Sequence, residues 1–307
     1  IPYLIETDVP ALNLIQATEI DFHFLEGLEN LGPQTITKQI DKQLSKSVKA
    51  YKSGKGPLVI PVSEVPKSWL LLFDYGTVLN GMPQLDIQGL GGTKVAVLTA
   101  PFVVDDQFSH EVVKSIFMDR ISLSGKRDHW EATYFKPTRF LAIAVQSGNE
   151  PVYIYNTGIH QISYPFVKKG KMASSEAPWI EHYFKASGKT IETCTTDAYT
   201  DNYRERRQYA QTGFYAALGN YYVFGDTALQ RRYLIQVVQE QKANGIMAAY
   251  APLTGDDYMV ILDSNCLYIR SLYNYFLYSG DRETTLKLLP AAKKLMELLH
   301  ALSLIHI

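Results

Sequence analysis

One pattern occurs twice in this chain at a fixed distance. The segments Tyr221–Leu234 (YYVFGDTALQRRYL) and Tyr275–Leu289 (YFLYSGDRETTLKLL) both run from aromatic residues through Gly-Asp to a Thr and a Leu. A glycine in the left-handed conformation often ends a helix, and a following aspartate can cap the next one, so we expect turns at Gly225 and Gly280. Two helical hairpins spaced 55 residues apart are therefore predicted. Such a repeat is typical of an α/α solenoid or a closed α/α toroid, and about six hairpins would need roughly 300 residues.

Apolar residues around these turns recur with a helical period. The two faces with this spacing are Ala210, Phe214, Ala217, Leu218 and Tyr221, and then Leu229, Tyr233 and Val237. Both are typical of amphipathic helices. We expect the chain to be helical from about residue 166 onward and to hold the first third of a toroid.

The preceding part of the chain has a different period. Short apolar or alternating segments separated by turn residues extend from Trp69 to about Ser163: WLLLFDYG, MPQLDIQ, TKVAVLTAPFVV, DRISLSG, HWEATYF, RFLAIAVQ and VYIYNTGIHQIS. This pattern predicts an all-β sandwich or jelly roll. The GLGG at Gly89–Gly92 lies between two strands and opens no helix, so we expect a hairpin turn there and not a phosphate-binding loop.

The length of 307 residues is about twice that of a usual domain. We predict a multidomain β and α protein, with an incomplete, unassigned segment at 1–66, a β-sandwich domain at 67–165 and a truncated helical barrel at 166–307. The chain begins without Met, and its final HALSLIHI carries no helix cap, so we expect both natural ends to be missing. The compartment cannot be read from such a sequence.

The charge and composition of the chain argue against several classes of binding partner. Thirty Lys and Arg against 31 Asp and Glu leave a net charge of -1, so we expect neither nucleic acid nor an anionic membrane as a partner. No apolar run is long enough for a membrane span. Cys194 and Cys266 match no metal or disulfide spacing, and we expect them to be buried and inert. No metal or cofactor motif is found, and we expect none.

One stretch concentrates groups that could do chemistry. Between Thr200 and Phe214 (TDNYRERRQYAQTGF), Glu205 is flanked by Arg204, Arg206 and Arg207, with Tyr203 and Tyr209 close by. Thr200 or Asp201 could cap a helix whose first turn holds Glu205, with solvated arginines that lower the pKa of this glutamate. Alternatively, the tyrosines offer flat apolar faces for sugars and Glu205 is a general acid.

Other candidates lie on both sides of this stretch. Asp257, Tyr258 and Asp263 follow a glycine-bearing loop in the next hairpin and are either sugar-binding residues or part of a solvated loop and helix cap. We expect Trp179 and His182 to be helix-packing residues, with a role at the edge of a sugar site as the alternative.

The stretch 200–212 resembles a segment of the bacterial α-L-rhamnosidases of glycoside hydrolase family 78. At the mouth of an (α/α)6 barrel, these enzymes carry Asp-Cys-Pro-x-Arg-Glu-Arg/Lys-Leu-Gly-Trp-x-x-Asp, or a variant with Gln-Tyr near its end. Arg204, Glu205 and Arg206 fall on Arg-Glu-Arg, and Gln208 and Tyr209 on Gln-Tyr. The segments 72–100, ANGIMAAYAP (residues 243–252) and 261–281 also resemble parts of this family in the same order.

The resemblance implies a six-hairpin glycosidase that removes terminal α-L-rhamnose by an inverting acid/base mechanism. It implies that Glu205 is the general acid and that the general base lies beyond Ile307, so this chain alone is expected to be inactive. The substrate-binding residues implied in this way are Arg204, Asp201, Tyr209, Tyr203, Asp263 and Asp257.

Departures from the family pattern keep two alternatives open. Thr200 stands at the family's leading Asp, with Asp201 one residue away, and Thr212 stands at the closing Asp. A six-hairpin glycosidase for another sugar and a non-catalytic carbohydrate-binding protein on the same scaffold both fit these changes. The resemblance also suggests a periplasmic or secreted protein whose partner is a rhamnose-containing glycan.

Overall fold

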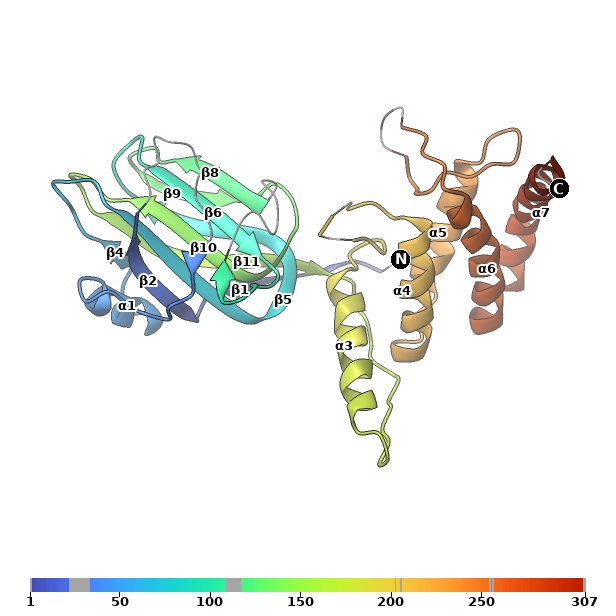
Figure 1. The fold of residues 1–307 in the computed structure, drawn as a ribbon, viewed down its shortest axis with the longest axis horizontal. Coiled ribbons are helices and arrows are strands. Elements are labelled where there is room, and N and C mark those ends of the chain that lie inside the picture. Colours follow the sequence, from blue (N-terminus) through green and yellow to red (C-terminus); the bar gives the residue numbers. More distant parts are fainter. Residues whose placement is uncertain are drawn as a thin grey trace. The chain divides into compact units, whose positions relative to one another are not determined.

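The computed structural model describes residues 2–21, 34–108, 117–201, 203–204, 206–253, 255 and 257–305. The chain divides into a β unit, Glu6–Ile162, and a helical unit, Ser163–Ile307 together with Ile1–Ile5. Figure 1 shows the strands of the first in blue to green and the helices of the second in yellow to red. The order of a β part followed by an α part agrees with the sequence pattern.

The described part of the β unit contains one curled sheet of nine strands. They are β1 (Ile5–Pro10), β2 (Leu14–Ile20), β4 (Leu58–Ile60), β5 (Ser68–Gln88), β6 (Lys94–Ala100), β8 (Met118–Ser122), β9 (Arg127–Glu131), β10 (Lys136–Gln146) and β11 (Val152–Ser163). Two short strands, β3 (Gln34–Thr35) and β7 (Gln107–Phe108), pair separately, and helix α1 spans Ser45–Lys52.

Strand β5 connects two layers of the sheet. Its first half, up to Asn80, pairs with β10 and β2, whereas its second half, from Gly81, pairs with β11 and β9. Side chains of the second half alternate between buried and partly exposed, because one face packs on the core and the other meets solvent. Residues from both halves, such as Phe73 and Leu85, share one apolar cluster. The two separate strands expected at 69–76 and 82–88 are therefore one continuous strand.

Two further sequence expectations differ from this topology. Gly89–Gly92 joins β5 to β6, but these strands are separated by β10 in the sheet, so this segment is a crossover loop and not a hairpin turn. The first 66 residues supply β1, β2 and β4, which pair with β11 or β5, and the units divide at 5/6 and 162/163. Buried Leu14 and Leu58 explain this, because they add to the same apolar cluster.

The helical unit contains α3 (Trp179–Thr193), α4 (Ala210–Val223), α5 (Ala228–Gln239), α6 (Leu262–Ser279) and α7 (Arg282–Ile305). The two repeated turns form as predicted. Gly225 and Gly280 have φ of 64° and 67° after α4 and α6, in the left-handed region. Asp226 accepts a hydrogen bond from the backbone N–H of Ala228 at 3.1 Å, and Asp281 from that of Thr284 at 3.0 Å.

Helices α4 to α7 pack through a common apolar cluster. Tyr233 of α5, Tyr268 of α6 and Leu295 of α7 are fully buried there. The buried positions Leu229, Tyr233 and Val237 follow the helical spacing seen in the sequence. The amphipathic helices expected after residue 166 are thus present.

Helix α3 is more exposed than the sequence suggests. Trp179 is 61% exposed and His182 is exposed, so the prediction that both pack between helices is wrong. Trp179 instead meets Tyr183 one turn later, with ring centroids 5.7 Å apart. Cys266 on α6 is also exposed, contrary to the expectation of a buried thiol, because the face of the helix that bears Tyr268 and Leu272 is the buried one.

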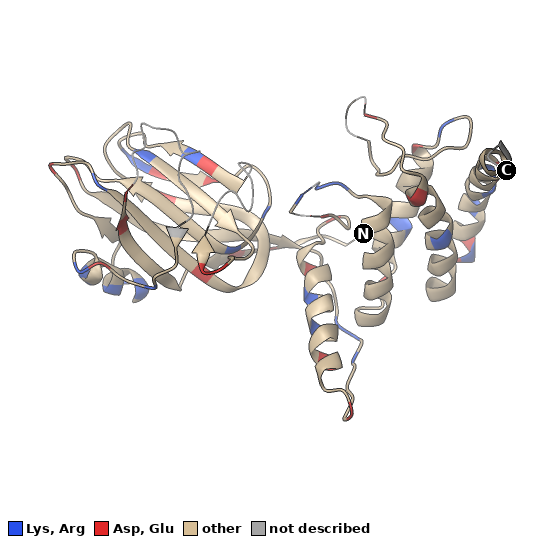
Figure 2. Ribbon diagram, in the orientation of Figure 1, with Lys and Arg blue, Asp and Glu red and all other residues tan. Residues whose placement is uncertain are grey.

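Charged residues of both signs are interspersed on the ribbon (Figure 2). On α3, Lys185 pairs with Glu181 at 2.6 Å, one turn apart. Of the helices that the structure describes, none combines the length and the apolar character needed to cross a bilayer.

Candidate active site

The acid loop, residues 201–209, is neither the start of a helix nor a strand. Helix α4 begins only at Ala210, and of the described loop residues Tyr203 and Arg204 form a turn while Tyr209 belongs to a β-bridge. Glu205 itself, like Asn202, lies outside the described residues. The helix-capping interpretation of this stretch is therefore wrong for its described part.

Asp201 folds the start of the acid loop. Its Oδ1 accepts hydrogen bonds from the backbone N–H of Tyr203 at 3.0 Å and of Arg204 at 2.9 Å, and its Oδ2 accepts one from Arg204 Nε at 3.2 Å. Burial favours the neutral acid, but these hydrogen bonds and the guanidinium outweigh it and lower the pKa of Asp201. The sequence predicted Asp201 as a sugar ligand, whereas its carboxylate here bonds within its own loop.

Arg206 has a strained backbone. Its φ of 56° lies in the left-handed region, which costs a residue with a side chain about 1 kcal/mol or more. Strain of this kind persists where surrounding contacts enforce it and is common at functional sites.

A second loop, residues 247–259, which we name the clasp loop, holds the acid loop. Tyr209 and Tyr250 form an antiparallel bridge, and the N–H of Ala210 donates to the carbonyl of Ala249 at 2.9 Å. Gln208, which is 5% exposed, donates from Nε2 to the carbonyl of Ala251 at 2.7 Å and to Gln236 Oε1 of α5 at 2.9 Å. The two loops are joined by backbone and side-chain bonds together.

Side chains from the two loops meet at an exposed cluster. Arg207 Nη1 lies 3.3 Å from Asp257 Oδ2, and its guanidinium carbon is 4.6 Å from the ring centroid of Tyr250. The rings of Tyr209 and Tyr250 are 5.3 Å apart, and the Tyr209 hydroxyl is 3.7 Å from the sulfur of Met259. A cation, a carboxylate and aromatic rings thus lie together beside the acid loop.

The remaining predicted residues have mixed surroundings. Tyr203 is partly buried, Arg204 and Asp263 are exposed, and Asp263 lies in the first turn of α6, whose N-cap is Ile261. The Tyr258 hydroxyl donates to the carbonyls of Glu240 at 2.8 Å and Ile246 at 3.1 Å, which makes it part of the clasp loop's framework. The structure thus brings Arg207, Tyr209 and Asp257 together and leaves Asp263 without a described contact to them.

Sequence reasoning missed two residues of this site. Tyr250 is fully buried and donates from its hydroxyl to the carbonyl of Asp257 at 3.1 Å, and Gln208 bridges three segments. Gln208 falls on the Gln-Tyr pair of the motif, and Tyr250 lies within ANGIMAAYAP. Both residues therefore lie in segments that resemble the family. Hydrogen bonds between two loops about 40 residues apart cannot be predicted from the sequence of either segment.

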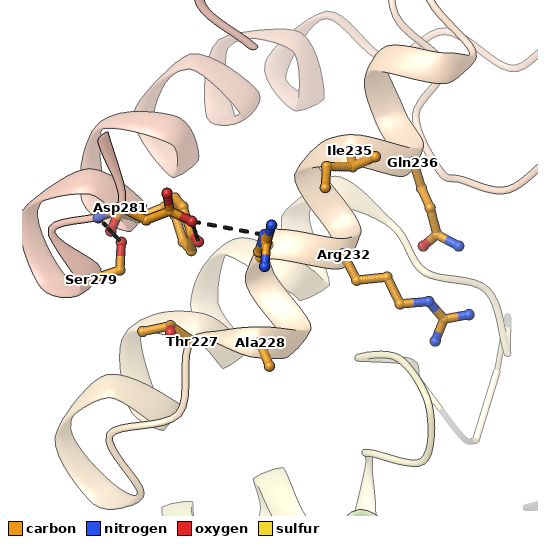
Figure 3. A pocket seen from close by; sticks show the side chains of 9 residues that line it. Thr227, Ala228, Arg232, Ile235, Gln236, Ser279 and Asp281 are labelled. Carbon is orange, nitrogen blue, oxygen red and sulfur yellow. Dashed lines mark hydrogen bonds and ion pairs between the residues drawn. The ribbon is translucent and has the colours of Figure 1, made fainter. Parts of the chain in front are cut away.

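A cavity lies elsewhere in the helical unit. About 460 Å³ in volume, it is lined by residues of α5 and of the turn from α6 to α7, and Figure 3 shows Arg232, Gln236 and Asp281 around it. None of the predicted site residues lines it.

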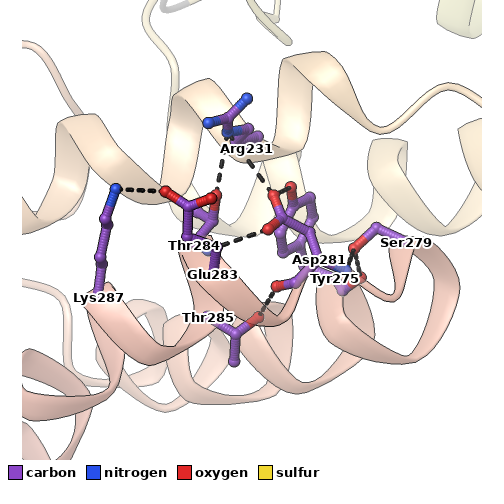
Figure 4. Close-up of polar contacts among 8 residues, drawn as sticks. All are labelled: Arg231, Tyr275, Ser279, Asp281, Glu283, Thr284, Thr285 and Lys287. Carbon is purple, nitrogen blue, oxygen red and sulfur yellow. Dashed lines mark hydrogen bonds and ion pairs between the residues drawn. The ribbon is translucent and has the colours of Figure 1, made fainter.

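The polar groups of this cavity belong to the repeated turn (Figure 4). Arg231 Nε donates to Thr284 Oγ1 at 3.1 Å and lies 3.7 Å from Asp281 Oδ2, and the Tyr275 hydroxyl donates to the same oxygen at 2.6 Å. Arg232 Nη2 pairs with Asp197 at 3.0 Å. The contacts of Arg231 fix α5 against the α6–α7 turn, and that of Arg232 ties α5 to the segment after α3, so we assign them a structural role.

Comparisons with known proteins place the acid loop and the clasp loop within one domain family. Residues 168–302 match the bacterial alpha-L-rhamnosidase 6 hairpin glycosidase domain. No curated protein sequence matches the chain.

Solved structures share the fold. The chain is similar to the GH78 family rhamnosidase of Bacillus sp. GL1, with 21% identity and a TM-score of 0.69 over 78% of this chain and 25% of that chain. It is also similar to a rhamnosidase from Klebsiella oxytoca with rhamnose bound, with 15% identity and a TM-score of 0.71 over 97% of this chain and 57% of that chain. A third similar structure is the Streptomyces avermitilis alpha-L-rhamnosidase complexed with L-rhamnose, with 18% identity and a TM-score of 0.58 over 80% of this chain and 25% of that chain. The chain thus spans from a quarter to just over half of the length of these proteins.

The helical unit is therefore of the six-hairpin glycosidase class, and the part of the chain before it forms a curled antiparallel β unit. Within this class the chain is rhamnosidase-like, which confirms the resemblance to glycoside hydrolase family 78 and the predicted β plus α fold.

Proposed function

We propose that this chain carries the general acid of a glycoside hydrolase that removes terminal α-L-rhamnose with inversion at the anomeric carbon. The observation that supports this most directly is that the family match at residues 168–302 includes the whole acid loop, 201–209. The substrate would be a rhamnose-containing glycan or glycoside.

In this proposal Glu205 protonates the glycosidic oxygen as its bond to the sugar breaks. A second carboxylate activates water on the opposite face of the ring, about 6.5 to 9.5 Å away from the acid. Without that carboxylate this chain would bind sugar but not hydrolyse it.

Two of the three arginines next to Glu205 in the sequence pair with other carboxylates. In the sequence, the three neighbouring arginines argue for a low glutamate pKa, which is wrong for an acid that must hold its proton near neutral pH. In the structure, Arg204 pairs with Asp201 and Arg207 with Asp257. Since two of the three positive charges are balanced by other carboxylates, their effect on Glu205 is reduced.

Substrate contacts are proposed for the exposed cluster. The partly exposed ring of Tyr209 offers an apolar face to a sugar, and Arg204 and Asp257 have solvent-exposed polar groups beside it. For Tyr203 and Asp263, a substrate-binding role stays a prediction that rests on the family resemblance alone. We propose Asp201 chiefly as the residue that shapes the loop, because its two oxygens already accept three hydrogen bonds.

Hydrolysis of an aryl α-L-rhamnoside by the gene product that contains this chain tests the proposal. We expect release of the aryl group, with the β-anomer of rhamnose seen first by NMR. The α-anomer first would contradict inversion, and turnover confined to another aryl glycoside would change the sugar. Rhamnose binding without turnover of any glycoside would support the non-catalytic carbohydrate-binding alternative.

A further inference from the structure

We propose that Gln208 is a positioning residue, which fastens the acid loop to the clasp loop and to α5 and thereby holds the segment that contains Glu205. The catalytic consequence rests on the function proposed above. The fastening itself does not, and it can be measured without any substrate.

Gln208 joins three segments of the helical unit through one side-chain nitrogen. Nε2 has two hydrogens, and both are used: one bonds the carbonyl of Ala251 at 2.7 Å and the other Gln236 Oε1 at 2.9 Å. The backbone carbonyl of Gln208 also accepts from the N–H of Ala251 at 3.4 Å. Acid loop, clasp loop and α5 therefore meet at this residue.

Gln208 is a buried side-chain link of the acid loop. The ion pair of Arg207 and Asp257, which also joins this loop to the clasp loop, has side chains that are 36% and 54% exposed. Exposed ion pairs contribute little because water competes with them, whereas a buried amide that loses its partners leaves unsatisfied groups behind. We therefore expect Gln208 to hold the loop more strongly than this ion pair does, in addition to the backbone bonds between the two loops.

The chemistry of the site requires an amide at this position. Both groups that bond Gln208 Nε2 are oxygen acceptors. The isosteric change Gln208→Glu replaces this NH2 group, which donates two hydrogen bonds, with a carboxylate oxygen that repels both acceptors. Gln208 Oε1 is buried and has no partner within the described part of the chain, so the change removes no second bond there. Side-chain volume stays constant while the anchor is lost.

The helical unit contains a matched control. Gln241 Nε2 also donates to two oxygens, the carbonyls of Gly245 and Ala291, both at 2.9 Å. These bonds tie the end of α5 to α7 and involve neither loop. Gln241→Glu therefore also removes two donated hydrogen bonds, at a partly buried position outside both loops.

Limited trypsin digestion measures the fastening, because Arg204 and Arg207 provide cleavage sites in the acid loop. We expect cleavage there to be about tenfold faster or more in Gln208→Glu than in the parent protein, as the loop opens more often. Gln241→Glu should cleave there at the parental rate. Cleavage at Lys189 of α3 reports global unfolding and should stay unchanged.

A second variant covers the case in which Gln208→Glu does not fold. Gln236→Met removes one of the two acceptors and leaves the bond to Ala251, so we expect acid-loop cleavage at a rate between those of parent and Gln208→Glu. Parental cleavage rates in every variant, or equal acceleration in Gln208→Glu and Gln241→Glu, would overturn the proposal.

The dependence of kcat on the leaving group distinguishes a loss of acid positioning from general damage to the active site. A dinitrophenyl rhamnoside departs with little help from an acid, whereas a methylphenyl rhamnoside requires protonation. For Gln208→Glu we expect kcat to fall about tenfold or more on the second substrate and less than about threefold on the first. An equal fall on both would refute positioning of the acid. If the parent hydrolyses neither, the proposed function fails, and digestion alone decides whether Gln208 fastens the loop.

Discussion

At the scale of single residues, the structure uses charged side chains mainly to hold loops in place. Asp201 and Asp257 were predicted as sugar ligands from their position in the sequence, yet each pairs with an arginine of the acid loop. The pair of Arg207 and Asp257 joins residues 50 positions apart. Local spacing predicts that such groups are close to a site, but it cannot predict which of them will neutralise one another.

Lys136 in the β unit leads to a stability prediction. Its side chain is fully buried and forms an ion pair with Asp119 of β8. Removal of one partner leaves an uncompensated buried charge, so we expect Asp119→Ala to destabilise the β unit by about 3 kcal/mol. Urea unfolding monitored by circular dichroism measures this.

The matched change for this pair is Lys136→Met, which keeps the apolar stem and removes the charge. We expect it to cost less than Asp119→Ala, because no ammonium then remains in the core. The account of this pair would be wrong if Lys136→Met proved the more damaging of the two.

At the scale of elements, helices were easier to predict than strands. The Gly-Asp turns and the spacing of Leu229, Tyr233 and Val237 correspond directly to α4–α5 and α6–α7. By contrast, two separate strands were expected at 69–76 and 82–88, but β5 continues through the residues between them because it exchanges β10 and β2 for β11 and β9. Pairing over long range decided the outcome, and turn residues alone could not reveal it.

The turn between α6 and α7 should stabilise the helical unit in a pH-dependent way. Hydrogen bonds from the Tyr275 hydroxyl first, and then from Thr284, lower the pKa of Asp281 to about 2. Since the folded pKa lies below the unfolded value near 4, the added stability is present above about pH 4 and is lost as pH falls towards 2.

Asp281→Asn should therefore unfold more easily than the parent at pH 6, and the difference should shrink towards pH 2.5. Urea midpoints of both proteins at several pH values measure this difference. A difference that stays constant over the range would mean that the charge of Asp281 does not stabilise the turn.

At the scale of the whole molecule, the sequence was sufficient to predict the class of fold but not the boundaries of the two units. The repeated turn, the change of period and the motif together indicated a β unit followed by a rhamnosidase-like helical domain, as the match at 168–302 confirms. Residues 1–66 carried no recognisable pattern, and the strands β1, β2 and β4 described there belong to the sheet through pairing with β11 or β5, which lie far away in the sequence. The clasp of the acid loop was equally invisible, since it depends on contacts between two loops.

The central claim is that Glu205 is the general acid, and the measurement that tests it most directly is the turnover of an aryl α-L-rhamnoside by the gene product and by its Glu205→Gln variant. We predict that kcat falls by about 10²- to 10⁴-fold while rhamnose still binds, because the amide keeps the shape but cannot supply a proton. A variant that retains turnover close to that of the parent would contradict the account and leave the acid loop as a structural feature of the barrel.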